Sequence, residues 1–285
     1  FPYTTLFRSV VGLIAEKAMV VSARIEASQV GSDILKKGGN AYDAMIATQL
    51  ALAVVYPQAG NIGGGGFMVH RDNKGNTGAL DFREKAPLLS DKDMYLDEKG
   101  NVIPGKSSFG VYSSGVPGSV AGIVEVYEKY GSLPFKDLVQ PAIDLARNGY
   151  KITENQARSL NRTRKRFQKA NNYKIAYEGE WKEGDVVKLE EFAQTLERIK
   201  DNGRDGFYKG KTADLIVNYV KELGGIITHE DLEKYKAIWR KPIEFDYKGY
   251  KIISMTLPAS GGICLAQILK SIEPYDLSKI EHNLG

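Results

Sequence analysis

The spacing of apolar and polar residues predicts a chain of helices interrupted by hairpins. A short helix over residues 27–35 is expected to end at Gly38-Gly39, because glycine permits a left-handed exit. Asn40 can cap a second helix, which places Asp43 in its first turn, where the helix dipole favours a negative charge. That helix is rich in alanine, so we expect it to pack closely and to be buried. Further helices are predicted over residues 119–130, 134–148, 154–169, 190–202, 211–223, 229–235 and 263–272.

Two hairpins are predicted where short apolar runs flank glycine-containing turns. Their strands and turns are residues 67–70, 73–76 and 78–83 for the first, and 241–247, 248–249 and 250–255 for the second. Helices and hairpins follow one another without the strict strand–helix alternation of a doubly wound sheet. The predicted fold class is therefore α+β.

The composition is that of a folded soluble protein and narrows the candidate chemistry. Of 285 residues, 42% are hydrophobic and 26% are charged, which excludes wholesale disorder. The formal net charge of +4 is too small to indicate a nucleic-acid partner. Cys264 is the only cysteine, and His70, His229 and His282 lie far apart without metal-ligand spacing. We therefore expect no intrachain disulfide, no metal ion, no cofactor and no bound nucleic acid.

The chain carries no apolar stretch long enough for a membrane-spanning helix and no secretory signal at its start. It opens without methionine, at Phe1-Pro2-Tyr3, and Thr4-Thr5 follow. We expect this opening to be a fragment edge or foreign sequence. The missing signal therefore gives no information about the compartment.

Three segments are candidate anion sites by pattern alone. The run 63–66 of four glycines could cradle a phosphate, but it follows a helix and precedes a strand, so a tight turn without room for side chains is the alternative. Ser260-Gly261-Gly262 at a helix start could bind an anion through free N–H groups, or Ser260 could simply cap the helix. The basic cluster of residues 158–169 could attract an anion or be a solvated helix face.

Arg83 is the most informative charged residue. In a strand it would share a face with Asp81, and its planar guanidinium could bind a carboxylate. The alternative is an intramolecular salt bridge to Asp81 or Glu84. No Gly-x-Ser-x-Gly motif marks a nucleophile, so the residues alone define no complete catalytic constellation.

A series of motifs in this chain resembles the gamma-glutamyltranspeptidases, also called glutathione hydrolases, of the N-terminal-nucleophile hydrolase superfamily. Each motif is weak alone, but together their order and spacing are specific. In chain order they are Met19-Val20-Val21-Ser22-Ala23, Ala27-Ser28, Gly38-Gly39-Asn40-Ala41 with Asp43-Ala44, Asn61-Ile62 followed by four glycines and Phe67, Leu80-Asp81-Phe82-Arg83-Glu84, Gly115-Val116-Pro117-Gly118 and Ser260-Gly261-Gly262.

The resemblance implies a precursor that cleaves itself into a large and a small subunit, forming a four-layer αββα sandwich. The new N-terminal threonine of the small subunit would attack the gamma-glutamyl amide of glutathione and form an acyl-enzyme. Water, or an acceptor amino acid or peptide, would then take the glutamyl group. The implied partners are glutathione and other gamma-glutamyl compounds, the acceptors and the small subunit. Bacterial relatives imply a periplasmic or secreted protein.

The resemblance also divides the chain. Residues 1–17 are expected to be an unmatched N-terminal segment. Residues 18–285 are expected to be a partial large subunit that ends before the self-cleavage site. The nucleophile would then lie beyond Gly285, so no catalytic residue is assigned here and the chain alone is expected to be inactive. Arg83 matches the family arginine that pairs with the alpha-carboxylate of the glutamyl group, and it is the one substrate-binding residue assigned.

Three alternatives stay open at this point. The chain could belong to a related cephalosporin acylase or to a poly-gamma-glutamate transpeptidase. It could also be a non-catalytic binding module that keeps the large-subunit surface. Arg83 argues against the acylases, because their acyl groups lack an amino-acid alpha-carboxylate.

Overall fold

The structure is a computed structural model that describes residue 12 and residues 14–277. The expectations for the opening Phe1-Pro2-Tyr3-Thr4-Thr5 and for His282 to Gly285 lie outside the described residues. The elements in chain order are α1 (Ile25–Lys36), α2 (Ala41–Val55), β1 (Phe67–Arg71), β2 (Thr77–Asp81), the 3₁₀ helix η2 (Val111–Ser113), α3 (Ser119–Tyr130), α4 (Phe135–Asn148), β3 (Tyr150–Lys151), α5 (Glu154–Ala170), β4 (Val186–Val187), α6 (Glu190–Asn202), α7 (Asp205–Tyr208), α8 (Gly210–Glu222), α9 (His229–Lys234), β5 (Ile238–Arg240), β6 (Ile243–Tyr247), β7 (Tyr250–Ser254) and α10 (Gly261–Ile272).

The start of α2 is fixed by a reciprocal cap. The Asn40 side chain accepts the N–H groups of Tyr42 and Asp43, and Asp43 accepts the Asn40 N–H at 3.0 Å. Asp43 is fully buried and also accepts the N–H of Ser132, which lies just after α3. The predicted cap and the predicted burial of this helix are both confirmed.

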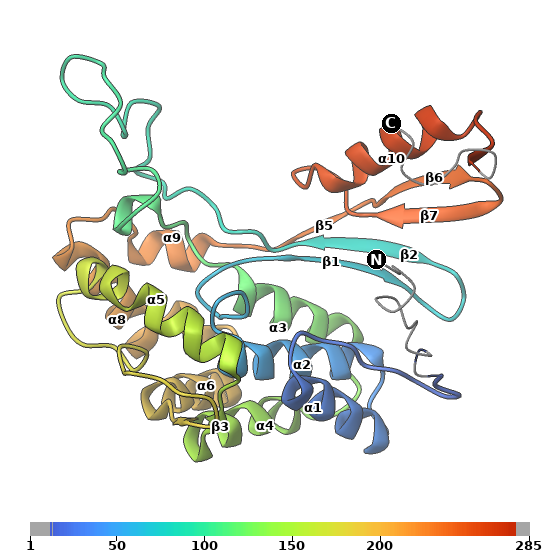
Figure 1. The fold of residues 1–285 in the computed structure, drawn as a ribbon, viewed down its shortest axis with the longest axis horizontal. Helices are drawn as coiled ribbons and strands as arrows, with labels where there is room; N and C mark the ends of the chain where they lie inside the picture. The colour runs from blue at the N-terminus through green and yellow to red at the C-terminus, as the bar shows by residue number, and fades with distance from the viewer. Residues whose placement is uncertain (1–11, 13, 278–285) are drawn as a thin grey trace, which may run out of the picture.

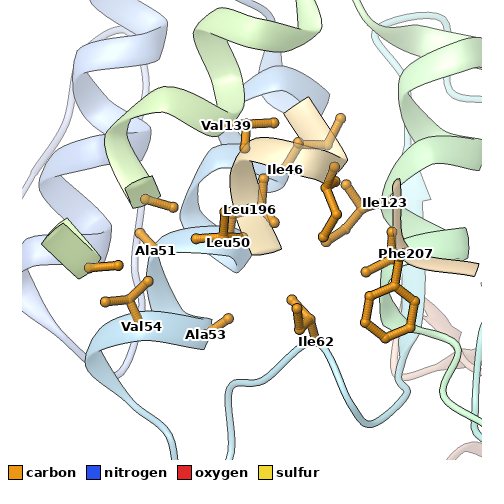
Figure 2. Packing of buried hydrophobic residues seen from close by; sticks show 14 of the residues in the cluster. Ile46, Leu50, Ala51, Ala53, Val54, Ile62, Ile123, Val139, Leu196 and Phe207 are labelled. Carbon is orange, nitrogen blue, oxygen red and sulfur yellow. The ribbon is translucent and has the colours of Figure 1, made fainter. Parts of the chain in front are cut away.

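The helices before β5 form one layer around a shared apolar core, and α10 lies apart from it. Helix α2 packs against α1, α3 and α4, and α4 packs against α6. Figure 2 shows Leu50 of α2 and Leu196 of α6 in one buried cluster with Ile62 and Ile123. Because this core lies between helices and beneath the first sheet, it fixes the position of the strands that lead into the candidate site.

A three-stranded antiparallel sheet, in the order β1-β2-β5, lies on this helical layer (Figure 1). Met68, Leu80 and Trp239 are paired across it, and all three pack against the core. The second hairpin, β6-β7, lies on the other side of the first sheet in Figure 1, and α10 covers it. The order helix, sheet, sheet, helix agrees with the expected αββα layers, and the α+β class is confirmed.

Some strands were not predicted, and three were predicted too long, by one residue at the end of β7 and by two at the start of β6 and the end of β2. Strand β5 pairs with β2 from more than 150 residues away, so no local pattern links them. The two-residue strands β3 and β4 are also new. Strand β2 ends at Asp81 rather than at Arg83, so regular side-chain alternation does not extend to the arginine.

Within residues 12 and 14–277, no helix combines the length and the apolar character that a membrane crossing requires. In the same part of the chain, no group of three or more His, Cys, Asp and Glu side chains is placed to hold a metal ion.

Candidate substrate-binding site

The glycine run, which directly precedes β1, is hydrogen-bonded to two other motif segments beside the end of β2. The Gly64 carbonyl accepts the Gly118 N–H at 2.7 Å, which ties the run to the start of α3. Gly66 and Phe82 exchange two backbone hydrogen bonds, of 3.3 and 3.0 Å, which extend the β1–β2 pairing beyond the strands. Residues 81–85 are therefore held against the glycine run on one side.

The motif segment that ends at Gly118 also holds residues 81–85 from the other side. Lys85 and Val116 exchange two backbone hydrogen bonds, of 3.1 and 2.7 Å. A little further on, the Leu88 N–H donates to the buried carboxylate of Asp231 at 2.6 Å. Segments that the sequence leaves about 20 to 50 residues apart thus meet around Arg83.

Close backbone packing, rather than unusual dihedral angles, requires glycine at positions in this run. None of residues 63–66 has a positive φ. A Cβ on Gly65 would lie only 2.7 Å from the Arg83 Cα, and one on Gly66 would lie 2.8 Å from the Phe82 ring. On Gly63, by contrast, it would meet nothing nearer than 3.8 Å. These contacts support the tight-turn interpretation over the phosphate cradle.

The peptide groups on both sides of Arg83 are hydrogen-bonded. Its N–H donates to the Asp81 Oδ1 at 3.1 Å, and its carbonyl accepts the Tyr235 hydroxyl at 2.7 Å. Burial raises the pKa of Tyr235, and the charges of Asp81 and Glu84 raise it further. The Tyr235 hydroxyl therefore stays protonated and available as a donor.

The Arg83 side chain, in contrast, projects from this fixed backbone and is 52% exposed. Its Nε lies 3.8 Å from the Glu84 Oε1, and within the described residues its guanidinium makes no hydrogen bond. A half-exposed ion pair at this distance contributes little to stability, about 0–1 kcal/mol. The guanidinium is thus available to a carboxylate ligand.

The predicted alternative of a salt bridge from Arg83 to Asp81 is wrong. Asp81 is buried, and its Oδ2 accepts a hydrogen bond from the Nε of Arg240 at 2.8 Å and forms an ion pair with the Arg240 Nη2, also at 2.8 Å. The alternative partner, Glu84, does contact Arg83, but weakly. Asp81 therefore holds the backbone of the arginine, whereas the role of Arg83 as a substrate ligand stays a prediction.

The other two candidate anion sites gain no support. The Ser260 side chain makes no capping hydrogen bond at the start of α10, so the N-cap interpretation is wrong as well. On α5, Arg158 pairs with Glu154 and Arg164 with Glu180, and the remaining cations of the cluster are exposed. The cluster is a solvated helix face.

Sequence reasoning missed Tyr235 and Arg240. Both lie more than 150 residues beyond the groups that they contact, and neither belongs to a recognisable motif. The position of Tyr235, directly after α9, gives no signal of a role at the end of β2.

The layered fold and the segments that converge on Arg83 are those of a large-subunit portion of an N-terminal-nucleophile hydrolase. The sequence profile of the family described as gamma-glutamyltranspeptidase matches residues 27–284. The chain belongs to the gamma-glutamyltranspeptidase family.

Individual relatives agree with this assignment. The chain is 46% identical over 269 residues to a glutathione hydrolase proenzyme of Escherichia coli K12, which covers 93% of this chain and 46% of that protein. It superposes on the Helicobacter pylori gamma-glutamyltranspeptidase with a TM-score of 0.92 at 46% identity, covering 96% of this chain and 79% of that one. The Pseudomonas nitroreducens gamma-glutamyltranspeptidase, complexed with L-DON, gives 0.89 at 42% identity, with coverages of 95% and 81%.

The chain spans about half the length of the curated relatives that it matches, 46% for the first and 48% for the second. The predicted division at residues 17 and 18 is not tested by these matches and stays a prediction.

Proposed function

We propose that the protein carrying this chain cleaves the gamma-glutamyl amide of glutathione and passes the glutamyl group to water, or to an amino acid or peptide. The observation that carries the proposal is the Arg83 guanidinium, which is half-exposed, makes no hydrogen bond within residues 12 and 14–277, and extends from a backbone held from both sides. Family membership supports the reaction class. By the same family resemblance we propose a periplasmic or secreted location.

In the proposed mechanism, Arg83 binds the alpha-carboxylate of the glutamyl group through two parallel N–H donors. This contact orients the gamma-carbonyl toward a threonine nucleophile supplied by the small subunit. The threonine oxygen forms a bond to the carbonyl carbon, the amide C–N bond breaks, and the nucleophile's proton leaves with the amine of cysteinylglycine. Arg83 takes no part in bond breaking.

The first prediction tests this assignment of the chemistry. The 285-residue chain alone should not hydrolyse a chromogenic gamma-glutamyl anilide, because we propose that the nucleophile lies outside residues 18–285. The full-length protein should hydrolyse the anilide and become inactive when the threonine at its cleavage motif is replaced. Turnover by the chain alone that a nucleophile-directed inhibitor abolishes would show that the chemistry has been misplaced.

One face of the first sheet supports the proposed small-subunit partner. Directly paired residues of antiparallel strands point to the same face of the sheet. Asp81 pairs with both Phe67 and Ile238, so Phe67 and Ile238 lie on the same face. Phe67 is 36%, Val69 39% and Ile238 39% exposed on that face. In a finished αββα sandwich such residues would be covered by further strands.

The second prediction follows from this exposure. The chain expressed alone should self-associate, because uncovered apolar side chains and unpaired strand edges favour association. Size-exclusion chromatography with light scattering should show species larger than a monomer, and replacing Phe67 and Val69 by serine and threonine should reduce them. A monodisperse monomer with a sharp cooperative melt would contradict the prediction and favour a self-contained binding domain.

A further inference from the structure

The carbonyl group of Arg83 has a partner that belongs to no family motif described above. The Tyr235 hydroxyl donates to this carbonyl at 2.7 Å, across 152 positions of sequence. Tyr235 itself is 2% exposed, so the donor side of this part-buried hydrogen bond lies inside the protein. Without this donor the Arg83 carbonyl would lose its hydrogen-bond partner in the protein.

The Tyr235 ring and backbone are both held in place. The ring stacks on Tyr208, with centroids 5.9 Å apart and planes 8° from parallel. The Lys85 Nζ lies 4.9 Å from the ring centroid on a neighbouring strand segment. The Arg204 guanidinium donates to the Tyr235 carbonyl at 2.7 Å. A side chain so constrained can hold its hydroxyl at one point.

The Tyr235 hydroxyl fits at this position only because residue 118 is glycine. A Cβ on Gly118 would overlap both the Tyr235 Oη and the carbonyl oxygen of Phe82. Gly118 is the last residue of the motif segment that precedes α3, and its N–H already donates to Gly64. The close approach of Tyr235 to Arg83 is therefore built into the fold of the site.

We propose that Tyr235 is a positioning residue for recognition of the substrate carboxylate. Its hydroxyl fixes the peptide that carries Arg83, complementing Asp81, which fixes the peptide on the other side. This inference rests on the proposed function, in which Arg83 binds the alpha-carboxylate. Regular β-structure ends at Asp81, so without Tyr235 the Arg83 carbonyl would lose its hydrogen-bond partner. A bidentate guanidinium contact depends on direction, and preorganisation of its backbone lowers the cost of binding.

The experiment compares Tyr235→Phe with the wild type in the full-length protein. Phenylalanine keeps the ring that stacks on Tyr208 and removes only the hydroxyl. KM for a gamma-glutamyl anilide should rise roughly three- to tenfold, the value of one hydrogen bond, and kcat should change less than KM. Assays are run well below the melting temperature of each variant, so that lost stability does not enter KM.

A matched control separates positioning from general destabilisation. The Tyr127 hydroxyl accepts the Phe135 N–H at 3.0 Å near the far end of α3, so Tyr127→Phe also unpairs one backbone group. It should lower the melting temperature without raising KM. A rise in KM equal to that of Tyr235→Phe would overturn the inference.

A double-mutant cycle tests the route through Arg83. If Tyr235 acts by aiming the arginine, adding Tyr235→Phe to Arg83→Lys should raise KM by clearly less than it does in the wild type. If the two effects multiply, Tyr235 acts independently of Arg83 and the inference is overturned. A wild-type protein that processes normally but does not cleave the anilide would overturn the proposed function together with this inference. Unchanged KM in Tyr235→Phe, with an active wild type, would overturn the inference alone.

Discussion

Replacing Arg83 by lysine or glutamine in the full-length protein should reduce kcat/KM for glutathione roughly 30- to 1,000-fold. A charge-assisted bidentate contact accounts for about 2–4 kcal/mol, and lysine cannot reproduce its planar pair of donors. The loss should appear mainly in KM if the carboxylate is bound equally well in the ground and transition states. Steady-state kinetics of the processed enzyme measure both parameters.

Two controls define what the Arg83 result means. Self-cleavage of the precursor should proceed in both variants, because the arginine takes no part in the nucleophilic chemistry. An acyl substrate without an alpha-carboxylate should be almost indifferent to the substitutions. Variants that process normally and keep the wild-type KM and kcat would leave Arg83 as no more than the weak ion-pair partner of Glu84.

Most helices of this chain could be predicted because their signals are local. The Asn40–Asp43 cap and the alanine-rich segment after it predicted a buried α2, and the structure has both. The turn at Lys248-Gly249 likewise predicted the β6–β7 hairpin, where Lys248 and Gly249 adopt positive φ. Capping and turn chemistry act over a few residues, so a single sequence is enough to read them.

The arrangement of the candidate site could not be predicted in this way. Strand β5 and the Arg240 that pairs with Asp81 are brought to β2 by the whole intervening helical layer. Short strands of this kind have no periodicity to detect. The distances that matter at the site are therefore set by tertiary packing rather than by local pattern.

Arg83 itself was selected by resemblance, since its local pattern favoured an ordinary salt bridge. The structure bears only on the salt-bridge interpretation. Glu84 does lie within ion-pair distance, but the close carboxylate neighbour, Asp81, is taken by Arg240. No residue type or spacing near Arg83 could have revealed that competing pair.

Replacing Gly65 by alanine should disturb the site from the side of the glycine run. The added Cβ would lie 2.7 Å from the Arg83 Cα and closer still to the Glu84 backbone nitrogen. Neither backbone atom can rotate away, so the glycine run and the backbone around Arg83 must move apart. Overpacking of this kind costs about 1–3 kcal/mol of stability, and a displacement of about 1 Å at a recognition group can lower the rate roughly 100-fold. Thermal melts and kcat/KM in the full-length protein measure the two effects.

Gly63 provides the control within the same glycine run. Its Cβ would meet only the Asn61 Oδ1, at 3.8 Å, and its φ suits an ordinary residue. Gly63→Ala should therefore keep both the melting temperature and kcat/KM close to wild type. If both alanines are tolerated alike, the run is a flexible connection and close packing against Arg83 does not matter for function. If only Gly65→Ala fails, the glycines act by bringing the backbone of the run against the backbone that carries the arginine.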